Sequence, residues 1–213
     1  MHSLSRIGFC FMKNFATEFH TLNYVIKESD DILLFAHSRP DGDTAGSVFA
    51  LKEYIKSLGK NVDAACFDPL PEYLHPLTPE RFQSPSDLDL GKYKLIIACD
   101  SVERGFEKIA GQLRPDQIVA LLDHHVSITM KKDINIIDPE ASAVCELVYD
   151  FFVSSKIGIN RNMATYLMLG ILGDTGVFQH ANTTPHVMEI SISVAVMFNV
   201  LPFTSNSRFS NAG

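Results

Sequence analysis

Four short segments combine aspartate and histidine side chains at spacings suited to metal binding. Each follows a hydrophobic run, and together they are His37-Ser38-Arg39-Pro40-Asp41-Gly42-Asp43, Cys99-Asp100-Ser101, Asp123-His124-His125 and Gly173-Asp174-Thr175-Gly176. A fold can therefore bring carboxylates and imidazoles together from four distant places. Two divalent cations need several anionic oxygens, because a buried cation and a buried carboxylate are each costly alone. We predict a two-metal site that hydrolyses a phosphate ester.

Each segment alone also has a structural interpretation. Asp41 and Asp43 can form a turn and cap a helix, and Asp100 can terminate a strand. Residues 173–176 can be a glycine-rich helix end. The adjacent histidines 124–125 have no obvious use in packing, since both rings carry nitrogens that need partners, although a structural pair stays open. One shared site explains all four segments at once, and we prefer it.

The segments around these motifs predict alternating strands and helices. Continuous apolar runs predict buried strands at 32–36, 62–67, 95–99 and 118–122. Apolar residues at helical spacing predict helices at 15–28, 44–58, 141–154, 160–172 and from 184 or 185 to about 199. Thr44 is the expected cap of the second helix, and Asp174 is expected just past the end of the fourth.

This alternation predicts an α/β fold class with a mainly parallel β-sheet flanked by helices. Ligands of such sheets bind at the carboxyl ends of the strands, where three of the four motifs fall. The connector 68–90 contains five prolines and is not expected to form a long helix.

The composition favours one ordinary globular domain. The chain has 213 residues, of which 46% are hydrophobic and 20% charged, and this balance argues against disorder. A net charge of -7 without a basic tail argues against binding to long duplex nucleic acid. A small anionic substrate recruited by metal ions stays compatible with these values.

The cysteines and the apolar runs bear on the compartment. Cys10, Cys66, Cys99 and Cys145 form no CxxC pair, so we expect buried thiols in a reducing compartment rather than a zinc knuckle or a redox site. Residues 1–12 lack the pattern of a signal peptide, and no apolar run approaches membrane-spanning length. We expect a cytoplasmic protein without a membrane partner.

Taken together, the motifs resemble those of the DHH phosphoesterase family. The resemblance rests on His37-x-x-Pro40-Asp41-Gly42-Asp43-x-x-Gly46-Ser47, Asp100, Asp123-His124-His125 and Gly173-Asp174-Thr175-Gly176, with 138–146 and 182–184 also similar. The branch it resembles most is that of the nano-RNase/pAp phosphatases, which degrade very short oligoribonucleotides and dephosphorylate adenosine 3′,5′-bisphosphate. The alternative is a relative that acts on a cyclic dinucleotide, single-stranded DNA or pyrophosphate.

The resemblance also implies a role for each matching residue. The implied metal ligands are His37 and Asp41 for one ion and Asp43, His124 and Asp174 for the other, with Asp100 bridging both. Mixed imidazole and carboxylate ligation suits manganese. The implied catalytic residues are Asp100 and His125, and His125 would lie next to the scissile phosphate. Weaker candidates for supporting the site are Asp123, Ser47 and Thr175.

Members of this branch usually continue into a second domain, called DHHA1, that grips the substrate. We expect a catalytic domain at 14–199, a loose tail at 200–213 and no DHHA1 domain. The expected partners are a short RNA or nucleotide and either a second copy of the chain or a protein that supplies the missing domain. A different class of function also stays open, namely a truncated, catalytically weak domain that binds nucleotide or metal.

Overall fold

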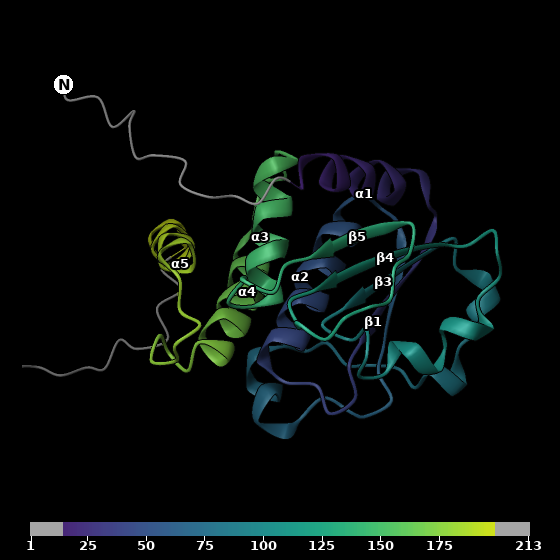
Figure 1. Cartoon of the computed structure of the whole chain (residues 1–213), viewed down its shortest axis with the longest axis horizontal. Helices are drawn as coiled ribbons and strands as arrows, with labels where there is room; N and C mark the ends of the chain where they lie inside the picture. The colour runs from purple at the N-terminus through teal and green to yellow at the C-terminus, as the bar shows by residue number, and fades with distance from the viewer. Residues whose placement is uncertain (1–14, 199–213) are drawn as a thin grey trace, which may run out of the picture.

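The computed structural model describes residues 15–198, and a parallel sheet lies at its centre (Figure 1). Its strands are β1 (Asp31–Ala36), β2 (Asn61–Ala65), β3 (Leu95–Cys99), β4 (Ile118–Asp123) and β5 (Ile134–Ile137). Their order is β2-β1-β3-β4-β5, and every neighbouring pair is parallel. The predicted α/β class with a mainly parallel sheet is confirmed.

Both faces of the sheet are buried, each under its own hydrophobic core. Successive side chains of a strand point to opposite faces, so each strand contributes to both cores. Leu34 of β1 and Ile97 of β3 belong to the larger hydrophobic core, which the α-helices complete. Phe35 and Ala98 belong to a second, smaller core on the other face. Strands that are apolar along their whole length are what such a doubly covered sheet requires.

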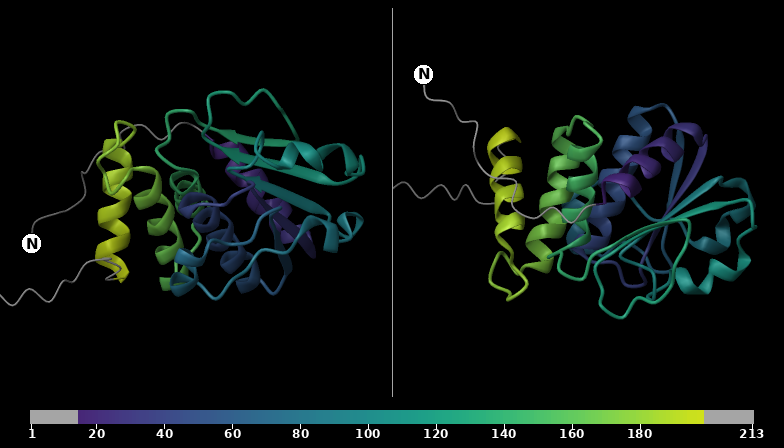
Figure 2. Two further views of the ribbon diagram at one scale, coloured as in Figure 1. Left: turned by 90° about the horizontal axis from the view of Figure 1, so that it is seen from below. Right: turned by 45° about the horizontal axis from the view of Figure 1, so that its top comes forward.

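The described α-helices lie on one face of the sheet. They are α1 (Ala16–Glu28), α2 (Gly42–Ser57), α3 (Val144–Ser154), α4 (Arg161–Asp174) and α5 (Pro185–Phe198). Away from the sheet, α2 is followed by α3 and α4 and then by α5 on the outside, as the views of Figures 1 and 2 both show.

Helix α2 packs tightly against α4, and two glycines permit the close approach. A Cβ at Gly46 would lie 2.4 Å from the backbone oxygen of Tyr166. A Cβ at Gly170 would lie 2.3 Å from Cys145 Sγ and 2.6 Å from Asp43 Oδ1. Any side chain at either position would push the helices apart, so the two glycines fix the start of α2 against α4.

Short 3-10 helices complete the fold. They are η1 (Glu72–Leu77), η2 (Pro85–Asp87), η3 (Leu90–Lys92), η4 (Phe106–Lys108) and η5 (Ala110–Gln112). Fully buried Phe106 of η4 and Ile109 beside it pack in the smaller core. This part of the chain therefore covers the face of the sheet that the α-helices do not cover. The connector 68–90 contains only η1, η2 and the start of η3, so the prediction that it lacks a long helix is confirmed.

The helix predicted from Thr44 begins earlier, at Gly42, and Thr44 is not its cap. Asp41 is the cap, because its Oδ1 accepts hydrogen bonds from the backbone N–H of Asp43 at 3.1 Å and of Thr44 at 3.0 Å. An aspartate is as good a cap as a threonine, and its position one residue before the helix satisfies the free N–H groups of the first turn. Asp174, predicted just past the end of α4, is the last residue of that helix.

The remaining differences are small. Strand β5 was not predicted, since its four residues are alternately buried and half-buried and follow the charged residues 131–133.

Cys66, Cys99 and Cys145 are free and buried, as expected. Cys10, the end of the last helix at 199 and the predicted tail lie outside the described residues. No helix in the described part of the chain has both the length and the apolar character that crossing a membrane demands.

Candidate metal centre

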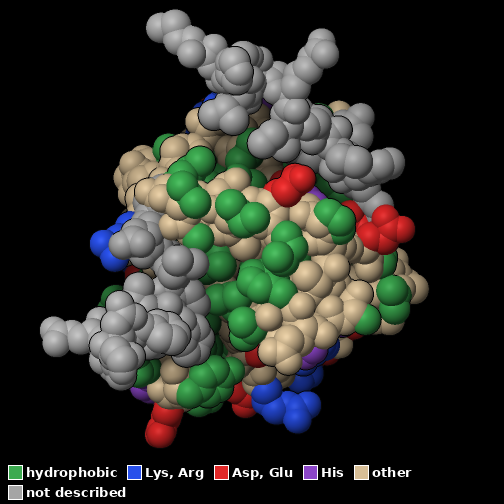
Figure 3. Space-filling view, turned by 90° about the vertical axis from the view of Figure 1, so that its left-hand side faces the viewer, with side chains coloured by type: hydrophobic (Ala, Val, Ile, Leu, Met, Phe, Trp, Pro, Cys, Tyr) green, Lys and Arg blue, Asp and Glu red, His purple; other side chains and the backbone are tan. Residues whose placement is uncertain are grey.

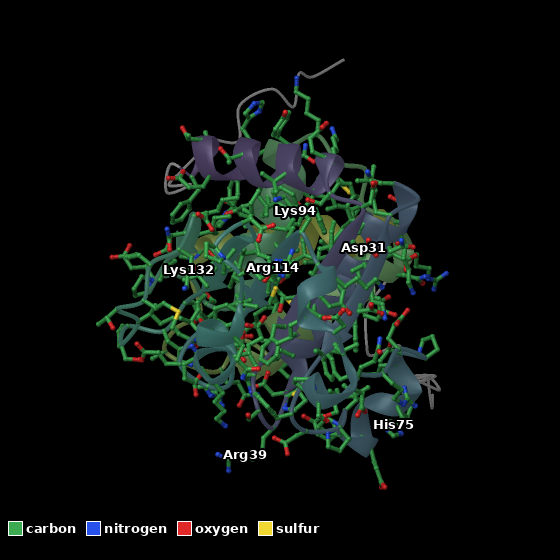
Figure 4. The ribbon with its side chains drawn as sticks, turned by 90° about the vertical axis from the view of Figure 1, so that its right-hand side faces the viewer. Asp31, Arg39, His75, Lys94, Arg114 and Lys132 are labelled. Atoms are coloured by element: carbon green, nitrogen blue, oxygen red, sulfur yellow. The ribbon has the colours of Figure 1, made fainter. Side chains whose placement is uncertain are left out.

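The loops that follow β1, β3 and β4 meet at the carboxyl edge of the sheet. Figure 4 shows Arg39, which follows β1, at the lower end of the molecule. Asp31 and Lys94, at the amino ends of β1 and β3, lie in its upper half. Parallel strands bring their carboxyl ends to one edge, so the predicted motifs converge there. Helices α2 and α4 add Asp43 and Asp174 to the same place.

One group joins His37, Asp41 and Asp100, whose potential ligand atoms all lie within 4.8 Å of one another. His37 Nδ1 donates a hydrogen bond to the carbonyl oxygen of Ser38 at 2.6 Å. This bond fixes the ring so that Nε2 faces the group. Nε2 lies 3.4 Å from Asp41 Oδ2 and 3.2 Å from Asp100 Oδ2.

A second group joins Asp43, His124 and Asp174, again within 4.8 Å. His124 Nδ1 donates to the carbonyl oxygen of Ala141 at 3.1 Å, so this ring is held in the same way as that of His37. Its Nε2 lies 3.3 Å from Asp174 Oδ2 and 3.8 Å from Asp100 Oδ1. Asp100 therefore faces the first group with one oxygen and the second group with the other.

Asp100 occupies an unusual backbone conformation, with φ at 53°. This left-handed region is uncommon for residues other than glycine and costs free energy. Two bonds hold the residue there: its N–H donates to Leu122 O at 2.9 Å, and Thr44 Oγ1 donates to its Oδ2 at 2.6 Å. Among the described residues, the buried Oδ1 of Asp100 has no hydrogen-bond partner.

Asp43 ties the centre to the rest of the fold. The backbone N–H of Val144 donates to its Oδ2 at 2.6 Å, and that of Cys145 donates to its Oδ1 at 2.9 Å. The carboxylate thus binds the amino end of α3 from the first turn of α2. Each of its oxygens keeps further lone pairs that could bind a cation.

The cluster concentrates negative charge in a buried space. Burial raises the pKa of Asp43 well above its ordinary value, and repulsion from Asp174 and Asp100 adds to the rise. Burial also raises the pKa of Asp174 to about 6, although a nearby imidazole opposes it. For His37, burial disfavours protonation, but hydrogen bonds to Asp100 and Asp41 outweigh it and raise the pKa to about 10. The cluster therefore holds positive charge strongly.

His125 is held beside the cluster by Asp123. Its Nδ1 donates to Asp123 Oδ1 at 2.8 Å, and the same oxygen accepts its backbone N–H at 3.0 Å. The hydrogen bond to Asp123 raises the pKa of His125. Burial of Asp123 acts to raise the pKa of that carboxyl, but the bonds from His125 outweigh it and lower the pKa. His125 is 37% exposed, so its ring reaches the surface at the edge of the cluster.

Ser47 and Thr175 contact backbone rather than the cluster. Ser47 Oγ donates to Thr44 O at 3.1 Å, within α2. Thr175 Oγ1 donates to Ile171 O at 2.6 Å and accepts the N–H of Phe178 at 3.1 Å. Both are buried hydroxyls that stabilise helix ends and turns, and a role in substrate binding stays a prediction.

Two neighbours of the site were not among the predicted site residues. Thr44, expected only as a cap, contacts Asp100 through its hydroxyl. Arg104 is exposed, and with Asp123 and His125 it lines a small cavity of about 120 Å³. The one sequence signal for Arg104 is a positive charge four residues after Asp100 on the same loop. Nothing in the sequence pairs Thr44 of α2 with the residue that follows β3.

Comparison with known proteins identifies the family. A family model described as the N-terminal domain of the DHH family matches residues 31–171. The chain belongs to the DHH family. The first three motifs of the predicted site lie inside the matched range, and the fourth, at 173–176, follows just after it.

Two curated relatives of this DHH protein are called bifunctional oligoribonuclease and PAP phosphatase NrnA. The one from Thermus thermophilus is 31% identical over 189 residues, which cover 85% of this chain and 57% of the relative. The one from Bacillus subtilis is 30% identical over 190 residues, covering 85% and 56%. This DHH chain therefore spans about half the length of these relatives.

A solved structure has the same fold. An exopolyphosphatase-related protein from Bacteroides fragilis superposes on the chain with a TM-score of 0.78 at 20% identity, covering 90% of this chain and 59% of that protein. At this level of identity the similarity concerns the DHH fold alone.

Proposed function

We propose that this chain is the catalytic domain of a phosphoesterase. It uses two divalent metal ions, with manganese as the preferred ion, to hydrolyse short oligoribonucleotides and adenosine 3′,5′-bisphosphate. One observation carries the proposal, namely the buried Oδ1 of Asp100, which has no hydrogen-bond partner among residues 15–198. A buried anionic oxygen without a hydrogen bond is costly, although His125 Nδ1 lies 3.4 Å from Asp100 Oδ1. A cation between Asp100 and the second group would satisfy it.

The residues present fit two cations. Each group offers one imidazole nitrogen and two carboxylates, and Asp100 faces both groups. The Nδ1 atoms of His37 and His124 donate hydrogen bonds to backbone carbonyls, which leaves each Nε2 available to bind a metal. Mixed nitrogen and oxygen donors suit manganese better than magnesium, which prefers oxygen and keeps its waters.

Divalent ions bound here would activate a water molecule and neutralise charge on a phosphate. The chain's own residues would position the substrate and neutralise its negative charge. The raised pKa of His125 keeps its ring protonated to a higher pH than usual, so it could donate a hydrogen bond to a phosphate oxygen where negative charge develops. Arg104 would add a second positive charge on the same side.

The names of the curated relatives support the choice of substrate, because both are called oligoribonuclease and PAP phosphatase. The acidic net charge of -7 also favours a short substrate bound through metal ions over long nucleic acid bound through a basic surface.

We also propose a cytoplasmic location and a partner or second copy that covers α5. Buried free cysteines support a reducing compartment. Hydrophobic side chains gather on the face of the molecule where α5 lies (Figure 3). On α5, Met188 is 38%, Ile192 60% and Val196 79% exposed, and such surfaces favour association.

The proposed function is tested by manganese-dependent hydrolysis of adenosine 3′,5′-bisphosphate and of a short RNA by this chain. We expect turnover that EDTA abolishes and that Asp100→Asn reduces below detection, because one carboxylate serves two cations. The matched control is Asp116→Asn, at an exposed aspartate paired with Arg114, which should keep full activity. Undiminished hydrolysis by Asp100→Asn would contradict the shared role of this carboxylate.

A further inference from the structure

A cavity of about 660 Å³ adjoins the metal centre. Asp41 and Asp174, one from each ligand group, are among its lining residues. The volume falls within the range of about 300–1,000 Å³ that is usual for small-molecule sites. A molecule whose phosphate lay at the metal centre would therefore find space for its remaining part directly beside it.

The cavity is a slot between two elements. Tyr73 and Leu77 of η1 line one side, and Met168 and Leu172 of α4 line the other. Thr165 also lines it, one turn before Met168. At a rise of about 1.5 Å per residue, Thr165 lies about 14 Å along the helix from the metal-centre end of α4. The slot thus extends away from the metal centre along the helix.

The walls are apolar and incompletely covered. Tyr73 is 66% exposed, Leu77 49% and Val177 52%, although all three line the cavity. Within the described part of the chain, Tyr73 makes no contact with another aromatic ring. A flat apolar ligand placed in the slot would cover these side chains and could stack on the Tyr73 ring.

The far end of the slot is polar. Thr165 Oγ1 donates to Arg161 O at 2.9 Å, which leaves the lone pairs of the hydroxyl free to accept a hydrogen bond. The Arg161 side chain lines the same end, and no acidic side chain among the described residues lies within ion-pair distance of it. An occupant that is flat and apolar on its faces and polar at its edge matches this lining.

We propose that the cavity binds the base and ribose of a nucleotide whose phosphate lies at the metal centre. The proposal rests on the proposed function and specifies where its substrate is recognised. Stacking on Tyr73 would accept any base, because every base has an aromatic face. Thr165 and Arg161 would contact polar groups at the edge of the base. The site would therefore prefer nucleotides to other phosphate esters without strict choice of sequence.

The test measures binding of 2-aminopurine ribonucleoside 5′-monophosphate to the whole chain by fluorescence, in EDTA and in magnesium. Tyr73→Ala should weaken binding by about fivefold or more, the range expected for loss of one stacked base. Thr165→Trp, which fills the slot, should weaken it further. The matched control is Tyr24→Ala, since Tyr24 on α1 is 61% exposed and does not line the cavity. It should bind like the parent chain.

The proposal would be overturned by equal binding in Tyr73→Ala and Tyr24→Ala, or by a parent chain that does not bind the nucleotide, as expected if a protein segment fills the slot. Hydrolysis of bis(p-nitrophenyl) phosphate by the parent chain with manganese is measured in parallel. Loss of that activity would count against the proposed function. If the parent chain hydrolyses bis(p-nitrophenyl) phosphate but Tyr73→Ala and Tyr24→Ala bind the nucleotide equally, the result would count against the role of the cavity and not against the proposed function.

Discussion

Replacing Gly170 with alanine should displace Asp43 from its place in the candidate metal centre. The new Cβ would lie 2.6 Å from Asp43 Oδ1 and 2.9 Å from Asp43 Cα. Carbon atoms in contact settle at about 3.5–4.0 Å, so the start of α2 must move by roughly 0.6–1 Å. Metal–ligand distances tolerate only about 0.2 Å. We expect the affinity for the ion held by Asp43 to fall about 10- to 100-fold, as it does when groups that support a ligand are changed.

The same substitution should lower the free energy of unfolding. Overpacking of a buried contact costs about 1–3 kcal/mol. Alanine in place of glycine inside a helix, in contrast, contributes about 1 kcal/mol of stability. The expected net loss is about 0–2 kcal/mol. The matched control is Gly173→Ala in the same helix, whose Cβ would meet only Gly42 Cα, at 3.8 Å. It should gain the helical contribution without the clash.

Calorimetric titration with manganese and thermal unfolding in EDTA separate the two effects. The two variants should differ by about 1–3 kcal/mol, which corresponds to about 2–12 °C in Tm for a chain of this size. Gly170→Ala should also bind manganese more weakly than Gly173→Ala does. Equal Tm values together with parental manganese affinity in both variants would refute the argument that Gly170 positions Asp43.

Three further outcomes are expected. Asp123→Asn should lower the pKa of His125, since the carboxylate that raises it is lost, and should slow hydrolysis about 10- to 100-fold. NMR titration measures the pKa and kinetics measure the rate, and an unchanged pKa would contradict the role of Asp123. A hydrogen bond to Asp150 raises the pKa of His186, so the folded protein binds this proton more tightly than the unfolded chain. The stability from this pair is fully present below about pH 6.5 and is lost as the pH rises through the raised pKa; His186→Gln should remove that pH dependence of Tm, and an unaltered profile would disprove it. Manganese at 100 times its Kd should stabilise the protein by about 2.7 kcal/mol per site, seen as a Tm rise of about 5–11 °C that chelation reverses, whereas a constant Tm would argue against a metal centre.

The sequence was sufficient for most of the fold because the sheet is buried on both sides. Strands such as β3 are then apolar throughout, and a run like 95–99 has one simple interpretation. Strand β5 escaped notice because it lies at the edge of the sheet and is only alternately buried. The start of α2 was misplaced because Asp41 and Thr44 are both acceptable caps, and only the three-dimensional hydrogen bonds decide between them.

The candidate site was predictable to the level of its motifs and no further. Aspartates and histidines at strand ends can be gathered from sequence, because parallel strands share a carboxyl edge. The bond of Thr44 to Asp100 joins residues 56 positions apart, and no local pattern encodes such a pairing. The slot between η1 and α4 is likewise a product of tertiary packing, since apolar residues on α4 have the same spacing whether they face a core or a cavity.

The bonds of Asp43 to the amino end of α3 span 101 and 102 residues of sequence. We expect contacts between such distant residues to form late in folding, because the entropy of loop closure opposes them until much of the chain is ordered. The candidate metal centre would then be complete only in molecules that have nearly reached the native state. A cation that binds there would slow unfolding far more than it would accelerate folding. Metal supply would thus set the lifetime of the native protein, and leave the rate at which it forms largely unchanged.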